Sequence, residues 1–397
     1  MDYGLREVRV VPRALTGKML SLANVFPVVT LTGPRQSGKS TLVRNAFSGY
    51  RYVSLEDVDM RALAKDDPRS FLERFNSRVI LDEAQRVPEL FSYMQGVIDR
   101  YDRPGQYVLS GSQNFLLLKS ISQSLAGRAA ILHLLPLSYA ELSSAGVAPS
   151  EMSKFLLSGG YPRLNTMGID PQDFFPSYIS TYIDRDIREE LGVKKVAEFN
   201  TFLTMCATRI GEVLNLASLA NDCNVSVDTV RGWLSILEAS FIAFRLHPYH
   251  RNYGKRLVKA PKLYFYDTGL AANLLGIESE EQMLTSQYRG SLYENAVVVE
   301  IIKQYQAIGR EPKLFYWRDS NKKEIDLILE KGGEPWCAIE VKSSATYNPK
   351  AFEVLEDLAP VMGVNPDRRF VVYGGNESFP TKHGQIIGMS DLGKLVG

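Results

Sequence analysis

Residues 33–40 have the types and the spacing needed to hold a chain of phosphates. Gly33 and Gly38 enclose four residues and are followed by Lys39 and Ser40, which fits G-x-x-x-x-G-K-[ST] in full. Glycines let the backbone wrap around phosphate with its N–H groups pointing inward. A lysine here reaches the β- and γ-phosphates, and the next hydroxyl can ligate Mg²⁺. We therefore expect ATP and Mg²⁺ as cofactors, held by Gly33, Pro34, Arg35, Gln36, Ser37, Gly38, Lys39, Ser40 and Thr41.

A pair of carboxylates stands at the end of a later apolar strand. Residues 79–81 are Val-Ile-Leu, and Asp82 and Glu83 follow them directly. In P-loop enzymes an aspartate at such a strand end holds Mg²⁺, and Glu83 would then orient the attacking water. Taken alone, the pair could equally be a helix N-cap with a glutamate in the first turn. Together with the upstream loop, it resembles the hydrolysing AAA-type branch of P-loop ATPases.

Further polar residues follow the next apolar strand. In the AAA-type fold a polar residue at this place senses the γ-phosphate, so the resemblance gives that role to Ser112 or Asn114. A polar turn that caps the strand is an equal alternative for either residue. Arg128, after a glycine, is a candidate arginine finger in cis or from a neighbouring subunit, with Arg185 and Arg209 as weaker candidates. A surface or ion-paired arginine is the commoner role.

A second group of charged residues lies near the C-terminus, where residues 324–342 read as a hairpin. Side chains alternate along a strand, so Glu340 and Lys342 share a face, and the hairpin can bring Asp326 close to them. Glu294 lies near the start of the preceding amphipathic helix. Converging carboxylates form a hard oxygen site for Mg²⁺, and a lysine beside them can stabilise charge developing on phosphorus. The alternative is an exposed sheet edge that charges protect from aggregation.

These positions resemble the PD-(D/E)XK nuclease family, whose motif residues would here be Asp326, Glu340 and Lys342, with Glu294 on the helix. The resemblance implies metal binding by Glu294, Asp326 and Glu340, and phosphodiester cleavage that also needs Lys342. The motif is short and degenerate, so it supports the fold more strongly than it supports catalysis.

The elements that must position these residues indicate an α/β protein with several domains. Short apolar strands with polar ends predict a doubly wound parallel sheet that binds its ligand at the carboxyl ends of the strands. We expect an AAA-type ATP-binding core over 1–135, a helical lid over 136–200, a winged-helix-like domain with a basic tract over 201–262, and a PD-(D/E)XK nuclease-like domain over 263–397.

The basic tract follows the predicted helix-turn-helix. Between 245 and 262 there are six lysines and arginines and no acidic residue, with Tyr249 and Tyr253 interleaved; the six are Arg245, Arg251, Lys255, Arg256, Lys259 and Lys262. Such a tract beside a winged helix suits contact with the phosphate backbone of DNA or RNA. Alternatively, the winged helix only packs domains together and the tract pairs with acids elsewhere.

The amino-acid composition excludes few classes of function. The 397 residues carry a net charge of +1, so no overall field attracts nucleic acid, and any contact needs a local patch. The three cysteines are scattered, which favours a reducing, cytoplasmic location. No apolar run is long enough for a transmembrane helix, and the N-terminus does not read as a signal peptide.

Nearly the whole chain resembles a group of uncharacterised bacterial and archaeal proteins that fuse an AAA-type ATPase to a nuclease-like C-terminal domain of unknown function. The motifs are GPRQSGKST, LDEAQ, LSGSQ, LAGR, LPLSYAE, GGYP, YIDRDI, FYDTGL, YENAVVVE, EIDLIL and IEVKS. The resemblance implies an ATP-driven protein that acts on nucleic acid or in defence, and such ATPases often work as oligomeric rings. Our leading hypothesis is an Mg²⁺-dependent ATPase that remodels or translocates DNA or cuts it under ATP control. The alternative is a non-catalytic ATP-dependent switch that docks a protein partner and only binds DNA.

Overall fold

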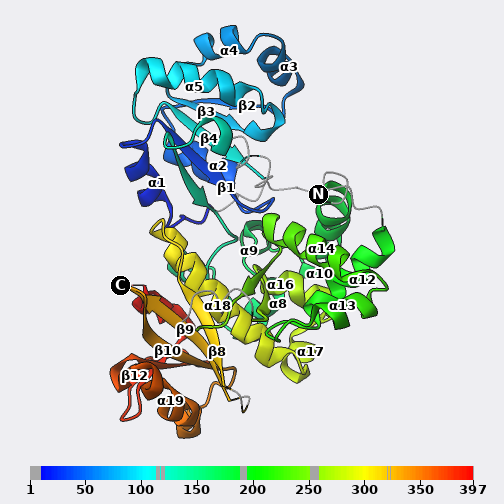
Figure 1. The fold of residues 1–397 in the computed structure, drawn as a ribbon, viewed down its shortest axis with the longest axis vertical. Helices are drawn as coiled ribbons and strands as arrows, with labels where there is room; N and C mark the ends of the chain where they lie inside the picture. The colour runs from blue at the N-terminus through cyan, green and yellow to red at the C-terminus, as the bar shows by residue number, and fades with distance from the viewer. Residues whose placement is uncertain are drawn as a thin grey trace, which may run out of the picture.

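The computed structural model describes residues 10–112, 117, 121–187, 195–250, 259–319, 321 and 323–396, without the side chains of 184–187. Along the chain it contains a parallel sheet with its helices, a mostly helical body and a second sheet (Figure 1). Among the described residues, no helix is both long and apolar enough to cross a membrane.

The first sheet has five parallel strands in the order β2-β3-β4-β1-β5. The strands are β1 (Val28–Thr32), β2 (Arg51–Ser54), β3 (Val79–Asp82), β4 (Tyr107–Gly111) and β5 (Ala129–His133). Its helices are α1 (Thr16–Ala23), α2 (Lys39–Ala46), α3 (Val58–Asp66), α4 (Pro68–Arg74), the short η1 (Ala84–Arg86) and α5 (Leu90–Tyr101). The doubly wound parallel sheet expected from the sequence is confirmed.

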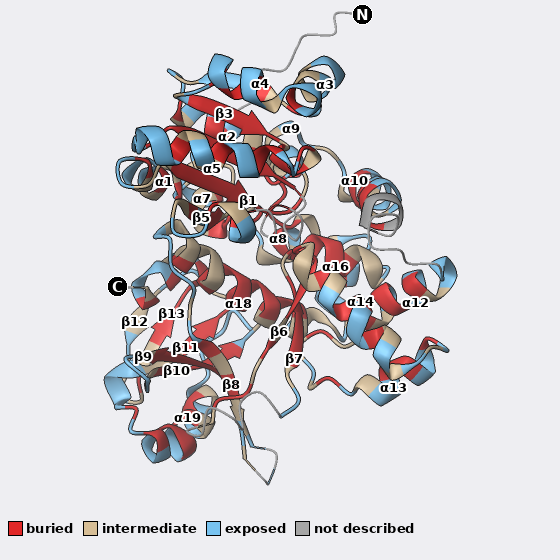
Figure 2. Ribbon diagram, turned by 45° about the horizontal axis from the view of Figure 1, so that its top comes forward, coloured by how far each residue is buried: buried red, intermediate tan, exposed pale blue. Residues whose placement is uncertain are grey.

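Strands β1, β3 and β4 are buried along their whole length, as Figure 2 shows in red, because helices cover both faces. Alternate residues enter two separate cores: Val29 and Ile80 pack with α1 and α2, whereas Val28 and Leu81 pack with α4 and α5. This two-sided burial explains why these strands read as continuous apolar runs rather than as alternating ones.

The helical body lies between the two sheets in the sequence. It contains α7 (Tyr139–Ser144), α8 (Met152–Ser158), α9 (Pro162–Met167), α10 (Pro171–Tyr178), the π-helix η2 (Ile179–Ile187), α12 (Val196–Ala207), α13 (Leu216–Asp222), α14 (Val227–Ala239), α16 (Thr268–Leu274) and α17 (Glu280–Thr285). A two-stranded antiparallel sheet joins β6 (Ala243–Leu246) to β7 (Lys262–Phe265). Ser226 caps α14, since its hydroxyl accepts from the N–H of Thr229 at 3.1 Å.

The boundary expected between residues 262 and 263 needs correction. It divides β7, which pairs with β6, and α16 packs on α8 and α10. Residues 263–285 therefore pack with the helical body, because their apolar side chains share its core, among them Leu263, Phe265, Leu270 and Met283.

The second sheet has six strands in the order β12-β13-β11-β10-β9-β8. They are β8 (Leu314–Arg318), β9 (Glu324–Lys331), β10 (Glu334–Lys342), β11 (Arg369–Tyr373), β12 (Phe379–Pro380) and β13 (Gln385–Ile387). The helices are α18 (Arg289–Ala307) and α19 (Glu353–Leu358), with 3₁₀ turns at Pro349–Phe352, Ala359–Met362, Pro366–Arg368 and Met389–Leu395. Ile339 and Val341 share a core with α18, and Ala338 shares another with α19, so one helix lies on each face.

Candidate nucleotide site and C-terminal carboxylate cluster

The phosphate loop joins β1 to α2 and needs glycine at two positions. Gly33 has φ +153°, and a Cβ there would lie 2.2 Å from the carbonyl oxygen of Leu134. Gly38 has φ +92°, a left-handed conformation that other residues rarely adopt, and α2 starts directly after it. The buried hydroxyl of Ser37 has no hydrogen-bond partner among the described residues. The loop therefore combines two backbone positions that need glycine, the N-terminus of α2 and the hydroxyl of Ser37. This combination fits the phosphates of a nucleotide.

Lys39 lies inside the loop. Its ammonium group donates to the carbonyl oxygens of Gly33 at 2.9 Å and Pro34 at 2.7 Å, and the residue is only 6% exposed. Burial lowers the pKa of Lys39 to about 8, although the carboxylates of Glu83 and Asp82 oppose the shift. Within the described part of the chain, this buried ammonium donates to two loop carbonyl oxygens, which it can exchange for phosphate oxygens.

Asp82 meets the loop at the carboxyl edge of the sheet. Its Oδ2 accepts hydrogen bonds from the hydroxyls of Ser40 at 2.7 Å and Tyr52 at 2.6 Å. Its Oδ1 accepts from the hydroxyl of Ser110. The structure thus brings together Ser40 and Asp82, the two expected Mg²⁺ ligands, as oxygen donors of the kind that Mg²⁺ prefers. Tyr52 was missed, because nothing in the sequence near it marks the end of β2 as part of the site.

Glu83 has a left-handed backbone with φ 52° and ψ 43°, which is uncommon for a residue with a side chain. Its Oε2 accepts hydrogen bonds from the side-chain amide of Gln85 and, at 3.1 Å, from the hydroxyl of Ser112. The carboxylate is therefore oriented from two sides. Ser112 follows β4 directly and lies beside Glu83, whereas Asn114 is outside the described residues.

A cavity of about 780 Å³ opens beside the loop. Lys39, Ser40, Glu83 and Ser112 line it, and so do two segments that the sequence did not indicate: residues 10–13 and the start of α9, with Arg163. Its size is that of a ligand pocket for a molecule as large as a nucleotide.

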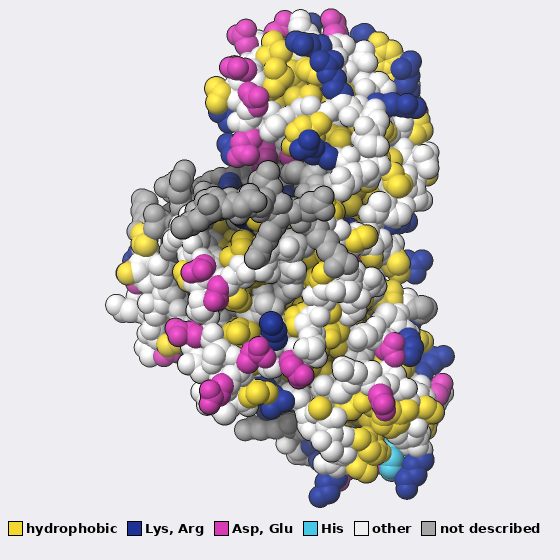
Figure 3. All heavy atoms as spheres, turned by 180° about the vertical axis from the view of Figure 1, so that it is seen from behind, with side chains coloured by type: hydrophobic (Ala, Val, Ile, Leu, Met, Phe, Trp, Pro, Cys, Tyr) yellow, Lys and Arg dark blue, Asp and Glu magenta, His cyan; other side chains and the backbone are white. Residues whose placement is uncertain are grey.

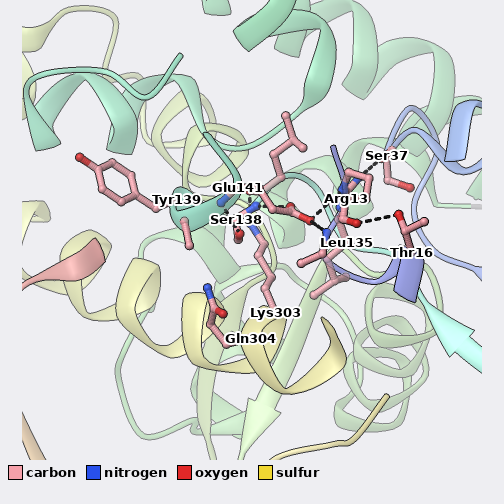
Figure 4. A network of polar contacts seen from close by, with 12 residues as sticks. Arg13, Thr16, Ser37, Leu135, Ser138, Tyr139, Glu141, Lys303 and Gln304 are labelled. Carbon is pink, nitrogen blue, oxygen red and sulfur yellow. Dashed lines mark hydrogen bonds and ion pairs between the residues drawn. The ribbon is translucent and has the colours of Figure 1, made fainter. Parts of the chain in front are cut away.

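Arg13 connects the phosphate loop to the segment after β5 (Figure 4). Its guanidinium donates to the carbonyl oxygen of Ser37 at 2.7 Å and that of Leu135 at 2.6 Å. It also donates to the carboxylate of Glu141 at 3.1 Å, and Glu141 closes a capping box at the start of α7. No motif marks Arg13, so the sequence could not have indicated this role.

The same segment is bonded to α18, which Figure 4 places beside Ser138 and Tyr139. The ammonium group of Lys303 donates to the carbonyl oxygen of Leu137 at 2.9 Å, and the carboxylate of Glu300 accepts from the N–H of Tyr139 at 2.7 Å. Burial raises the pKa of Glu300 and lowers that of Lys303. A chain of polar contacts thus runs from the phosphate loop to a helix of the C-terminal part.

The sheet does not fit Arg128, a candidate arginine finger in cis or in trans, as a finger for its own chain. Arg128 precedes β5 at the amino-terminal edge, where its carbonyl oxygen accepts from the N–H of Val28. The loop leaves β1 at the other edge, about 16 Å away for a five-residue strand. Arg128 instead pairs with Asp99 at 2.6 Å. Arg209 pairs with Asp222, and the side chain of Arg185 is outside the described residues.

In the C-terminal sheet, β9 and β10 bring the expected residues together. Ile339 pairs with Leu327, so Glu340 and Asp326 are the next residues on the two strands. Oδ2 of Asp326 accepts from the N–H of Val341 at 2.8 Å, and Lys342 pairs with Oε1 of Glu340 at 2.5 Å. Burial raises the pKa of both carboxyl groups; nearby Glu294 also raises both.

Glu294 lies beside these residues, together with three residues that were not expected there. Lys262 pairs with Glu294 at 3.1 Å and with Glu324, and the hydroxyl of Tyr264 donates to Glu294. Lys262 and Tyr264 come from β7 and Glu324 from β9. We use the name carboxylate cluster for Glu294, Glu324, Asp326 and Glu340.

The basic tract also needs correction where the structure describes it. Lys262 is buried in the carboxylate cluster, Arg245 forms two hydrogen bonds to Glu238, and Tyr249 is buried. Residues 251–258, with Arg251, Tyr253, Lys255 and Arg256, lie outside the described residues. The absence of acids within the tract was misleading because the partners lie outside it: Glu238 precedes the tract, and Glu294 and Glu324 follow it. On the face in Figure 3, basic and acidic side chains are interspersed.

Family models match three consecutive parts of the chain. An AAA domain matches residues 25–143, and domains of unknown function match 149–281 (DUF8612) and 289–392 (DUF4143). Uncharacterized protein Rv2008c of Mycobacterium tuberculosis is 32% identical over 360 residues, which cover 89% of this chain and 78% of that protein. The chain belongs to this family of AAA-type ATPases. An uncharacterized protein of Haemophilus influenzae is 23% identical over 341 residues, covering 77% of this chain and 80% of that protein.

Solved structures also resemble this AAA-type chain, at low identity. The Walker-type ATPase PABY2304 of Pyrococcus abyssi has a TM-score of 0.41 at 15% identity, over 67% of this chain and 96% of that one. The RuvB Holliday junction branch migration motor of Thermotoga maritima has a TM-score of 0.31 at 19% identity, over 59% of this chain and 90% of that one. The AAA match itself covers β1, β3 and the phosphate loop between β1 and α2.

Proposed function

We propose that the protein is an Mg²⁺-dependent ATPase that acts on DNA through its C-terminal part, as a remodeller or translocase or as an ATP-regulated nuclease. The proposed ATP hydrolysis rests on one observation. Lys39, Ser40 and Asp82 converge at one sheet edge, and Glu83 is held beside them. ATP binding and Mg²⁺ follow from the chemistry of these donors.

Each residue has a distinct role in this proposal. The ammonium of Lys39 would exchange the loop carbonyls for the β- and γ-phosphates. Ser40 and Asp82 would hold the metal ion, which would neutralise charge on the phosphates when bound. Glu83 orients the attacking water, and Ser112 contacts the γ-phosphate. Arg128, partly exposed at the far edge of the sheet, would serve a neighbouring subunit of a ring rather than its own chain.

The C-terminal half rests on the carboxylate cluster. As they stand, no three metal-ligating side chains among the described residues are arranged to hold an ion. After a rearrangement, Glu294, Asp326 and Glu340 would hold a divalent ion, which would polarise a phosphodiester when bound, and Lys342 would stabilise the charge that develops on phosphorus. A buried oxygen of Glu340 without a hydrogen-bond partner among the described residues supports this arrangement. The fold around it is proposed to be of the PD-(D/E)XK kind, with α12, α13, α14 and the β6–β7 sheet as a winged helix.

A second candidate is favoured by a specific observation. Lys262 and Lys342 already neutralise part of the carboxylate cluster, which suits a domain that binds DNA without cutting it. The protein would then be an ATP-dependent switch that docks a protein partner.

One experiment separates the two candidates. ATP hydrolysis and DNA cleavage are measured with single-stranded, duplex and branched DNA, in Mg²⁺ or Mn²⁺, for the wild type and for Lys39→Ala and Asp326→Ala. Exposed residues of the same parts of the chain, in Lys65→Ala and Asp367→Ala, serve as controls. Cleavage that is lost in Asp326→Ala and kept in both control variants supports the nuclease, and DNA-stimulated ATPase without cleavage supports the remodeller. ATPase activity indifferent to every DNA contradicts an action on DNA and leaves the switch.

A further inference from the structure

Lys262 is a buried cation in the middle of the carboxylate cluster. It is 3% exposed and lies at the first position of β7. Its ammonium group pairs with Glu294 of α18 at 3.1 Å and with Glu324 of β9, and it stands 5.6 Å from the ring centre of Tyr316. A lysine is rarely buried to this extent unless carboxylates surround it.

The ammonium group takes up the carboxylate oxygens that a metal ion would need. The cluster contains four carboxylates, but no three metal-ligating side chains are arranged to hold an ion among the residues that the structure describes. Lys262 bridges two of the carboxylates and Lys342 pairs with a third. Yet Oε2 of Glu340, a residue 5% exposed, has no hydrogen-bond partner in the described part of the chain. Lysine ammonium groups thus pair with three of the four carboxylates. One carboxylate oxygen, Oε2 of Glu340, still lacks a hydrogen-bond partner among the described residues.

We propose that Lys262 is an internal cation that competes with a divalent metal ion for the carboxylate cluster, so that the ion binds tightly only when this lysine is withdrawn. The inference rests on the proposed metal-binding role of the C-terminal part. Lys262 comes from the β6–β7 sheet, whereas the carboxylates come from α18, β9 and β10. A shift of β7 relative to the second sheet therefore changes the charge of the site without changing its ligands.

The physical reason is the balance of charge in a site that is largely closed to water. Breaking a buried ion pair by removing one partner leaves the other charge uncompensated, which is strongly unfavourable. Without Lys262, the carboxylates of Glu294 and Glu324 lose that compensation, and a divalent ion can supply it. Ion affinity and ion-dependent stabilisation should therefore both rise.

The test measures Mn²⁺ binding to the full chain without nucleotide. Binding is monitored by calorimetry and by the electron paramagnetic resonance signal of free Mn²⁺. Lys262→Met is expected to bind Mn²⁺ at least tenfold more tightly than the wild type. Lys313→Met is the matched control, because Lys313 also faces a glutamate on β9, Glu330 at 3.7 Å, but outside the cluster. Lys262→Met combined with Asp326→Asn should lose the added affinity.

Lys262→Gln, which removes the charge but keeps a hydrogen-bond donor, serves if the methionine variant does not fold. The melting temperature of either variant should rise more with Mn²⁺ than that of the wild type. Affinity equal to or weaker than that of the wild type in the folded variant overturns the inference. Tight Mn²⁺ binding without any DNA cleavage would count against the proposed nuclease and leave the role of Lys262 standing.

Discussion

The carboxylate of Asp267 accepts a hydrogen bond at 2.8 Å from the backbone N–H of Gly160, which lies 107 residues earlier in the chain. The same side chain caps α16, since it accepts from the N–H of Leu270 at 3.1 Å. Gly159 has φ +63°, and a Cβ there would lie 2.1 Å from Asp267. The GGYP and DTGL motifs therefore form one contact, directly before the residues of α9 that line the nucleotide cavity.

Asp267→Ala is expected to weaken both folding and nucleotide binding. It leaves two buried N–H groups without an acceptor, at a cost of about 1–3 kcal/mol each, and it frees the turn that positions Arg163. Urea unfolding and displacement of a fluorescent ATP analogue measure the two effects. The control is Asp170→Ala at the exposed N-cap of α10, which should cost about 1 kcal/mol and leave ATP affinity unchanged. Equal ATP affinity in the two variants would contradict the coupling.

ATP affinity should fall as the pH rises above about 8. Burial lowers the pKa of Lys39 to about 8 in the free protein, whereas phosphates favour the charged form. Above that pH, binding must take up a proton, so affinity should fall by up to tenfold per pH unit. Calorimetry in buffers of different ionisation enthalpy should show almost no proton uptake at pH 7 and nearly one proton at pH 9. Lys39→Arg, which does not titrate, should show none, and a pH-independent wild-type affinity would refute the expectation.

The same lowered pKa affects folding with a defined sign. The pKa of Lys39 lies below its ordinary value of 10.5, so between about pH 8 and 10.5 the unfolded chain binds more protons than the folded one. The contribution of this group to the free energy of unfolding therefore increases with pH across that interval. The difference in unfolding free energy between the wild type and Lys39→Met, measured at pH 8 and pH 10, reports this contribution.

Glu83→Gln should abolish hydrolysis and preserve nucleotide binding. The amide fills the same space between Gln85 and Ser112 but cannot take a proton from water, and proton transfer by a positioned group contributes about 10²–10⁴ in rate. We expect kcat to fall by at least about a hundredfold with ATP affinity within about threefold. Steady-state phosphate release and equilibrium binding are the measurements. Glu89→Gln, an exposed carboxylate nearby, is the control, and hydrolysis above a tenth of the wild-type rate would exclude Glu83 as the base.

Arg128→Ala should leave the ATPase rate of dilute, unassembled protein unchanged. The strand polarity places Arg128 at the edge of the sheet away from its own phosphate loop. The rate per chain is compared across a dilution series, alongside Asp99→Ala, which removes its partner. A loss of rate in Arg128→Ala that persists in the monomer would contradict the geometry, whereas a loss confined to assembled protein would identify a finger acting in trans.

The site residues that could be predicted are those whose partners are fixed by local structure. The loop at 33–40 is one contiguous motif. Asp82 ends β3, a parallel strand separated from β1 only by β4, so strand polarity brings it to the same sheet edge as Ser40. Asp326 and Glu340 are joined by a hairpin, where the alternation of side chains determines which face they share.

The residues that could not be predicted reach their sites from distant elements. Arg13 meets Glu141 across 128 residues, and Lys262 meets Glu294 across 32. Neither has a local pattern that distinguishes it from a surface cation, and Lys262 belongs to a tract whose composition predicts exposure. Burial decides the role of such residues, and burial here depends on how α18 and the second sheet pack against β7.

Helix α18 has a consequence for any attempt to recombine this protein with its relatives. It is a single helix of 19 residues, about 28 Å long, with Glu294 near one end in the carboxylate cluster and Glu300 and Lys303 bonded to the segment after β5. One inserted residue would turn one end by about 100° relative to the other and lengthen the helix by about 1.5 Å. A chimaera that joins the AAA part of one relative to the sheet of another must therefore inherit residues 294–303 as one block, or it loses one set of contacts.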